Sequence, residues 1–188
     1  MAVVGPGDAA PEALASAEAV GRALAEAGAV VVCGGLGGVM EAACRGARQA
    51  GGTTLGLLPG ADRAAANRWV DVAVATGLGE ARNALVVGAA DAVVAVAGGY
   101  GTLSEIALAL KAGKPVVGLG TWDVAGVEQA PEPAAAVAAA LRPQCPEGGG
   151  GSRPVTVRCG SRRMRGWCAR PPLAIIPTSP PSGLGKQA

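Results

Sequence analysis

The sequence predicts an α/β fold of the Rossmann-like type, a doubly wound parallel sheet with helices on both faces. The first observation behind this prediction is the order of segments: short apolar runs alternate with segments of helical periodicity over residues 1–142. The second is composition, because half of the 188 residues are hydrophobic whereas only 2% are aromatic. A core made of Ala, Val, Leu and Ile suits strands that helices cover on both sides.

The predicted elements follow from apolar runs and from the glycines and prolines that separate them. Ala2–Val4 ends in Gly5-Pro6-Gly7 and is predicted as a strand that leads into a glycine turn. Pro11 begins the next segment and Gly28 ends it, as is usual at the two ends of a helix. The predicted strands are residues 2–4, 29–33, 53–58, 70–74, 92–97 and, as the last one, 115–119; the predicted helices are residues 12–27, 39–50, 80–89, 102–112 and 133–141.

The periodic pattern stops after Arg142. Residues 143–188 hold eight of the 14 prolines, eight glycines and seven basic residues. Such a segment cannot bury enough apolar area to offset the entropy of ordering it. We therefore expect one domain, residues 1–142, and a disordered tail, residues 143–188. The tail is either a functional basic segment or an accidental extension; its mixture of Arg, Pro, Gly, Cys and Ser is typical of a GC-rich coding region read in a shifted frame, which favours the second interpretation.

Charge and composition exclude several classes of function. Residues 1–142 carry nine basic and 13 acidic residues, a net charge of −4, so the body has no basic stripe for nucleic acid. Histidine is absent, which excludes histidine-based catalysis and histidine-based zinc sites. No metal site and no cofactor are expected. The five cysteines form no C-x-x-C pair, no signal peptide precedes them, and no apolar run could span a membrane. These features predict a cytoplasmic protein with reduced thiols.

Two glycine-rich turns connect a predicted strand to a predicted helix. The first lies in CGGLGGVMEA, residues 33–42, and the second in AGGYGTLSE, residues 97–105. Both place backbone without side chains beside the first NH groups of a helix, which lack intrahelical partners and favour an anion such as phosphate. Neither turn fits the dinucleotide-binding or the Walker pattern. Glycines in one turn can simply make it tight, but two such turns in one small domain favour an anion site.

Two side chains near these turns could carry chemistry. Arg82 lies in TGLGEARN, residues 76–83, and could fork onto a phosphate or carboxylate, or be a surface residue paired with Glu80 or Asp91. Glu105 ends the run Thr102-Leu103-Ser104-Glu105, which fits a helix-capping box. It could equally be a carboxylate that faces the site from the first helical turn. Spacing alone leaves the role of Arg82 open and favours the cap for Glu105.

The segments GGLGGVMEA, GEARN and GGYGTLSE, in this order, resemble the Lonely Guy (LOG) family and its relatives once labelled possible lysine decarboxylases. The resemblance covers about residues 2–141 and is strongest to a bacterial branch of uncharacterised LOG-like proteins, which also resemble the molybdenum-cofactor carrier protein. It implies a Rossmann-like fold and a homodimer or larger homo-oligomer. Characterised LOG enzymes are phosphoribohydrolases that release the base and ribose 5-phosphate from cytokinin nucleoside 5′-monophosphates. No segment suggests a pyridoxal-phosphate lysine, so the decarboxylase label finds no support.

The resemblance also implies roles for individual residues. Glu105 matches the catalytic Glu that closes the family motif P-G-G-x-G-T-x-x-E, and Arg82 matches the catalytic Arg of the family. Three positions depart from the family: Ala97 replaces the proline of the motif, Asn83 stands where the enzymes have Lys, and Ser104 stands where many have Glu. These departures leave the core machinery in place but weaken the assignment of the substrate.

The function predicted from these motifs is cleavage of the N-glycosidic bond of a nucleoside 5′-monophosphate. Glu105 would stabilise an oxocarbenium-like state or activate water, and Arg82 would hold the ribose phosphate or stabilise charge on the departing base. A neighbouring arginine would keep Glu105 ionised near neutral pH. The alternative is a carrier or sensor that binds a nucleotide or phosphorylated cofactor without cleaving it. The partner in both cases is a small phosphorylated molecule, with no nucleic acid and no membrane. The predicted phosphate- or nucleotide-binding residues are Gly34, Gly35, Gly37, Gly38, Met40, Asn83, Gly98, Gly99, Tyr100, Gly101 and Thr102.

Overall fold

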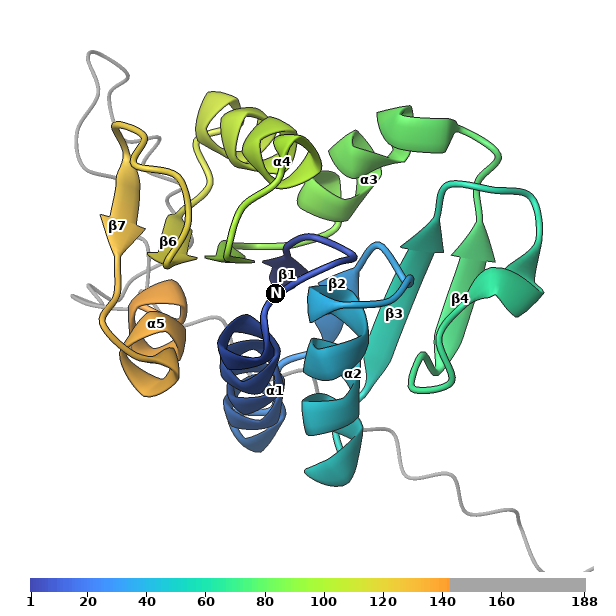
Figure 1. Cartoon of the computed structure of the whole chain (residues 1–188), viewed down its shortest axis with the longest axis horizontal. Coiled ribbons are helices and arrows are strands. Elements are labelled where there is room, and N and C mark those ends of the chain that lie inside the picture. The colour runs from blue at the N-terminus through green and yellow to red at the C-terminus, as the bar shows by residue number, and fades with distance from the viewer. Residues whose placement is uncertain (143–188) are drawn as a thin grey trace, which may run out of the picture. The chain divides into compact units, whose positions relative to one another are not determined.

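The computed structural model describes residues 1–142, and the tail predicted for residues 143–188 lies outside the described residues. The described part forms one seven-stranded, fully parallel sheet (Figure 1). The strands are β1 (Ala2–Val4), β2 (Val31–Cys33), β3 (Thr54–Leu58), β4 (Val72–Ala75), β5 (Val93–Val96), β6 (Val116–Leu119) and β7 (Val127–Gln129). The helices are α1 (Pro11–Glu26), α2 (Val39–Gln49), α3 (Asn83–Gly88), α4 (Tyr100–Lys111) and α5 (Pro133–Ala140), with single 3₁₀ turns at Arg63–Ala65 and Gly79–Arg82.

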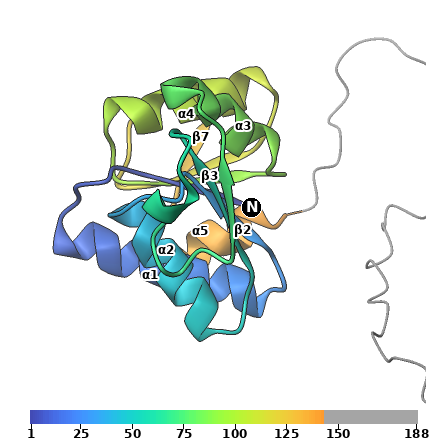
Figure 2. The same ribbon diagram turned by 90° about the vertical axis from the view of Figure 1, so that its right-hand side faces the viewer.

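The strand order β4-β3-β2-β1-β5-β6-β7 places β1 at the centre, where the order of the strands reverses. β1 pairs with β2 on one side and with β5 on the other. Helices α1, α2 and α5 cover one face of the sheet and α3 and α4 cover the other (Figures 1 and 2). This is the doubly wound Rossmann-like arrangement that the sequence predicts. In such sheets the ligand site lies beyond the carboxyl ends of the strands at the point of reversal.

The core consists of two apolar layers, one on each face of the sheet. Side chains alternate between the faces along each strand. Val94 and Val96 of β5 join the cluster under α1, α2 and α5, whereas Val93 and Ala95 join the cluster under α3 and α4. All four are buried, as is expected for a strand covered on both faces. Small aliphatic residues fill both layers, which fits the near absence of aromatic residues.

The structure corrects three boundaries of the predicted elements. Residues 115–119 are not the last strand, because β7 follows them as a short edge strand. Its residues are Val127, Glu128 and Gln129, mostly exposed, so no apolar run marks it. The helix predicted for residues 80–89 is a 3₁₀ turn followed by the short α3. Helix α4 begins at Tyr100 instead of Thr102.

Two further features bear on the predicted environment of the protein. Cys33 and Cys44 are free, buried thiols with their Sγ atoms 3.4 Å apart. The other three cysteines lie outside the described residues. Among residues 1–142, no helix is long and apolar enough to cross a membrane.

Candidate functional site

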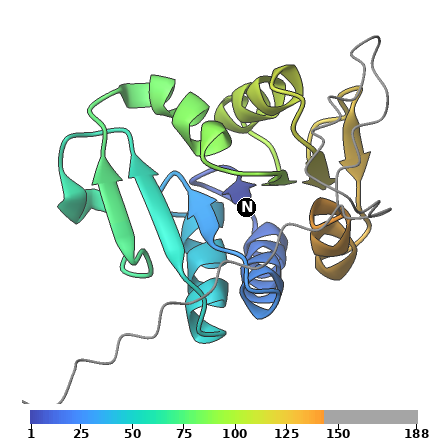
Figure 3. The same cartoon turned by 180° about the vertical axis from the view of Figure 1, so that it is seen from behind.

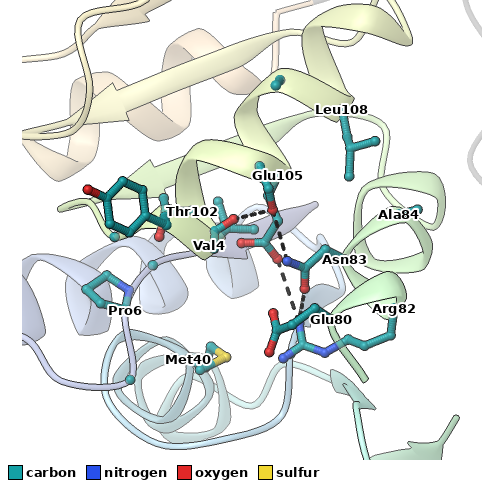
Figure 4. A pocket seen from close by; sticks show the side chains of 18 of the residues that line it. Val4, Pro6, Met40, Glu80, Arg82, Asn83, Ala84, Thr102, Glu105 and Leu108 are labelled. Carbon is teal, nitrogen blue, oxygen red and sulfur yellow. Dashed lines mark hydrogen bonds and ion pairs between the residues drawn. The ribbon is translucent and has the colours of Figure 1, made fainter. Parts of the chain in front are cut away.

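A cleft of about 1210 Å³ opens at the carboxyl edge of the sheet, beside the ends of β1, β2 and β5 (Figure 4). Figure 3 shows the ribbon of the same sheet and its helices from behind. Its volume is ample for a nucleotide-sized ligand. The structure brings most of the predicted site residues together along its wall: Gly34, Met40, Arg82, Asn83, Gly99, Tyr100, Gly101, Thr102 and Glu105. The predicted residues Gly35, Gly37, Gly38 and Gly98 do not line the cleft.

The N-terminus of α4 supplies hydrogen-bond donors to this cleft. Gly99 is the N-cap residue in an extended conformation, and no side chain caps the first turn. The first NH groups of a helix have no intrahelical partner. Thr102 is 2% exposed, and its Oγ1 atom is buried without a hydrogen-bond partner in the described structure. These unpartnered hydrogen-bond donors, together with the positive end of the helix dipole, fit an anionic group such as phosphate.

The capping box predicted for α4 is wrong. Because the helix begins at Tyr100, Thr102 is its third residue and Glu105 its sixth. Glu105 is therefore one turn too far along the helix to bond back to the N-cap. The helix-cap role that the sequence spacing favours therefore does not explain Glu105. This side chain is 6% exposed and lies on the wall of the cleft.

The first glycine turn has mainly a packing role. Gly38 has a φ of +65°, and a Cβ there would lie 2.4 Å from the carbonyl oxygen of Gly7. The NH of Val39, the first of α2, donates to the carbonyl oxygen of Pro6 at 3.1 Å. Gly35 has a φ of +75°, and its carbonyl oxygen accepts from the NH of Asn67. Tight-turn geometry thus accounts for Gly35 and Gly38.

Gly34 has a different role, because it makes room for Arg82. A Cβ at Gly34 would lie 2.5 Å from Nη2 of the Arg82 guanidinium. Arg82 is 6% exposed; its Nη1 atom donates to Oδ1 of Asn83 at 2.9 Å and lies 3.8 Å from Oε1 of Glu105. Its Nε atom is buried without a partner in the described structure. The alternative that Arg82 is a surface residue paired with Glu80 or Asp91 is therefore wrong.

Burial controls the charge of Glu105. Loss of solvation raises the pKa of its carboxyl group from 4.5 to about 7; Arg82 acts in the opposite direction and Glu80 adds slightly to the rise. The expectation that a neighbouring arginine keeps Glu105 ionised underestimates this burial. A carboxyl group with a pKa near neutral can take up or release a proton at physiological pH, which is a common property of functional sites.

Asn83 and Ser104 connect the two walls of the cleft. Nδ2 of Asn83 donates to Oγ of Ser104 at 3.1 Å, and the Ser104 hydroxyl donates to the carbonyl oxygen of Gly101 at 2.7 Å. Together with the Arg82–Asn83 bond, this network runs from the 3₁₀ turn to the first turn of α4. Figure 4 shows the Asn83 side chain beside α4, close to Glu105.

Sequence reasoning missed part of the cleft. Gly5, Pro6 and Gly7 line it directly after β1, and Glu80 and Lys111 line it from the two walls. The signal for the first three was present, since a glycine turn follows the first strand, and the first strand-to-helix turn of Rossmann-like folds borders the ligand. Glu80 and Lys111 follow no pattern that distinguishes them from surface charges. No cluster of three or more metal-ligating side chains occurs in the described part of the chain.

The fold and this cleft define a Rossmann-like α/β protein with a buried arginine–glutamate pair and an uncapped helix N-terminus at the wall of the cleft. The model of the SLOG cluster4 family matches residues 1–145, and the chain belongs to this family. An uncharacterised protein of Archaeoglobus fulgidus is 45% identical over 119 residues, which cover 63% of this chain and 78% of that protein.

Two solved structures are similar to this chain over most of their length. One is a molybdenum cofactor binding protein from the phototrophic bacterium Rippkaea orientalis, with 41% identity and a TM-score of 0.67 over 70% of this chain and 88% of that one. The other is the molybdenum cofactor carrier protein of Chlamydomonas reinhardtii, with 42% identity and a TM-score of 0.68 over 73% of this chain and 92% of that one. These similarities confirm the resemblance to LOG-like proteins and to the molybdenum-cofactor carrier.

Proposed function

We propose that this protein binds a phosphorylated cofactor of the molybdenum-cofactor class in the cleft and carries it without cleaving it. The observation that carries the proposal is the first turn of α4, where the buried Thr102 hydroxyl and the uncapped NH groups lack partners beside the cleft. The names of the two similar structures, a cofactor-binding protein and a cofactor carrier, support this choice of ligand.

The residues present fit such a cargo. The molybdenum cofactor is a phosphorylated pterin that holds molybdenum. Its phosphate would take hydrogen bonds from the backbone of Gly101 and from Thr102, as anions do at helix N-termini. Buried Arg82 would add a positive charge near the anion, and its unpaired Nε atom offers a further donor.

The Asn83–Ser104 contact favours a carrier over a hydrolase. These are two of the three positions at which the chain departs from the LOG enzymes, which have Lys in place of Asn83 and often Glu in place of Ser104. In this protein the two side chains touch at 3.1 Å, so the departures form one coupled change. A neutral hydrogen bond stands where the enzymes have a cation and often an anion, so an ion pair next to Arg82 and Glu105 is replaced without a change in net charge.

Phosphoribohydrolase activity is the second candidate, and the Arg82–Glu105 pair favours it. Glu105 is no helix cap, lies 3.8 Å from Arg82, and has a pKa raised to about 7. Cleavage of a ribosyl–base bond passes through an oxocarbenium-like state that an ionised carboxylate can stabilise, or for which it can activate water. The homo-oligomer that the resemblance implies stays a prediction for either function.

One experiment with two readouts tests the proposal. The full chain is incubated with molybdenum cofactor released from a molybdoenzyme and, separately, with AMP; bound cofactor is measured after gel filtration, and free base and ribose 5-phosphate are assayed. We expect the cofactor to elute with the protein and AMP to stay intact. Release of base by the wild type, lost in Glu105→Gln, would replace the carrier by the hydrolase.

The variant Thr102→Val tests the observation on which the proposal depends. It removes the hydroxyl and keeps the shape of the side chain, so we expect affinity for the cofactor to fall about tenfold, the scale of one hydrogen bond to a charged group. Thr53→Val is the matched control, because Thr53 is exposed and lies just before β3, at the opposite edge of the sheet. Equal affinities of the two variants would contradict the assignment of the anion site.

A further inference from the structure

Two aromatic residues meet at the rim of the cleft. The rings of Tyr100 and Trp122 stack with centroids 6.2 Å apart and an interplanar angle of 29°. Tyr100, the single tyrosine of a chain without phenylalanine, is 85% exposed, and Trp122 is 38% exposed. An exposed aromatic pair in a protein with so few aromatic residues gives the core nothing, which points to a role at the surface.

The backbone around this pair holds the two rings in place. Tyr100 is the first residue of α4, so its main chain is fixed by the helix. Nε1 of Trp122 donates to the carbonyl oxygen of Gly99 at 3.2 Å, and Nε2 of Gln129 donates to the carbonyl oxygen of Trp122 at 3.1 Å. A Cβ at Gly98 would lie 2.8 Å from Nε1 of Trp122. Gly98 therefore makes room for the indole, which explains a glycine that does not line the cleft.

The two faces of the Tyr100 ring have different surroundings. Trp122 stacks on one face and does not line the cleft, whereas Tyr100 does line it. Tyr100 is 85% exposed although Trp122 stacks on it, so most of its ring is accessible to a molecule bound in the cleft. Tyr100 also lies two residues before Thr102 in the same helical turn, so a ligand whose phosphate binds at that turn brings its remaining part close to this ring.

We propose that Tyr100, backed by Trp122, is the stacking surface for a planar heterocycle of the bound ligand, a pterin or a purine. This inference rests on the proposed binding of a phosphorylated ligand and deepens it, because it separates recognition of the ring from recognition of the phosphate. Stacking on an aromatic side chain accepts any flat heterocycle, since each presents a π-face. The surface therefore selects the class of ligand, and the phosphate site fixes its orientation.

The test compares three probes with the full chain by calorimetric titration: AMP, phosphorylated hydroxymethylpterin, and ribose 5-phosphate, which has no ring system. We expect Tyr100→Ala to weaken binding of the first two probes by roughly tenfold or more, the scale of one lost stacking contact. Its affinity for ribose 5-phosphate should stay within about twofold. Tyr100→Phe keeps the π-face and is the matched control, with affinities like the wild type. Stacking should also quench the fluorescence of the bound pterin in the wild type and not in Tyr100→Ala.

The outcomes separate this inference from the proposed function. Absence of binding of every probe to the wild type would overturn the proposed function and the inference together. Binding of all three probes with equal affinity, or equal losses in Tyr100→Ala for ring and ringless probes, would overturn the stacking surface alone. A Tyr100→Ala variant with unchanged ligand binding and an altered oligomeric state would assign the pair to self-association instead. Because Tyr100 is mostly exposed, we expect the melting temperature of the variant to match the wild type, which checks its folding.

Discussion

Replacing Glu105 by Gln removes a buried negative charge and keeps the size of the side chain. Glu105 is 6% exposed and its pKa is raised from 4.5 to about 7 by burial, which outweighs the attraction of Arg82. A raised pKa means that the folded protein favours the protonated, neutral form of this carboxyl group. We therefore expect Glu105→Gln to be more stable than the wild type at pH values where Glu105 of the wild type is ionised.

The sign and size of the effect follow from proton linkage. Between pH 4.5 and about 7 the folded protein keeps a proton that the unfolded chain has released, so the contribution of Glu105 to the free energy of unfolding falls as the pH rises through this window. A shift of roughly 2.5 pH units corresponds to about 3 kcal/mol at about 1.4 kcal/mol per unit. The difference between Glu105→Gln and the wild type should be small near pH 5 and reach about 3 kcal/mol by pH 8.

Urea denaturation of both proteins from pH 5 to pH 8 measures this difference directly. Other acidic residues titrate in both proteins, so their contributions cancel in the comparison. Glu26→Gln, which changes an exposed glutamate at the end of α1, controls for the substitution itself. Stability profiles of Glu105→Gln and wild type that run parallel over the whole range would refute the assignment of a desolvated carboxyl group to the cleft.

Two further predictions concern the neighbours of Glu105. Gly34→Ala would place a methyl group 2.5 Å from the Arg82 guanidinium, so we expect the guanidinium to move. AMP, a phosphorylated probe of the cleft, is expected to raise the melting temperature of the wild type by binding the folded state, and this rise should be smaller in Gly34→Ala. Gly88→Ala, with open space around its Cβ position, should leave the rise unchanged. Asn83→Lys adds a buried charge next to Arg82 and should lower the free energy of unfolding by about 2 kcal/mol or more. Adding Ser104→Glu should restore at least half of that loss in urea denaturation, because the two side chains are in contact. Strictly additive effects of the two substitutions would contradict the coupled change.

The sheet was predictable because its strands are continuous apolar runs that hardly depend on distant residues. β5, with the sequence VVAV, is buried on both faces, and both its continuous apolar run and its flanking turns mark it. β7 was not predictable, since its stability comes from pairing with β6 and its own residues are mostly polar and exposed. Local patterns thus identify buried strands and overlook an edge strand that tertiary contacts create.

The site was predictable in its residue types and less so in its geometry. Glycine turns, Arg82 and Glu105 could be named from their motifs, but the start of α4 two residues earlier changes Glu105 from a cap to a wall residue. The burial of Arg82 depends on Gly34, which is 48 positions away in the chain and leaves space for the guanidinium. No spacing rule connects these two residues. The Tyr100–Trp122 stack likewise joins segments that only the fold brings together.

The protonation of Glu105 also distinguishes what the two candidate functions need. A carrier that holds a phosphate gains from a neutral Glu105, because an ionised carboxylate nearby would repel the anion. A hydrolase that passes through a positively charged state needs the ionised form. A pKa of about 7 makes both forms accessible, so Glu105 alone does not decide between them. The decision then falls to the groups around it. The neutral Asn83–Ser104 bond replaces the Lys, and often Glu, that the LOG enzymes have beside the catalytic pair, and this departure from the enzymes favours the carrier.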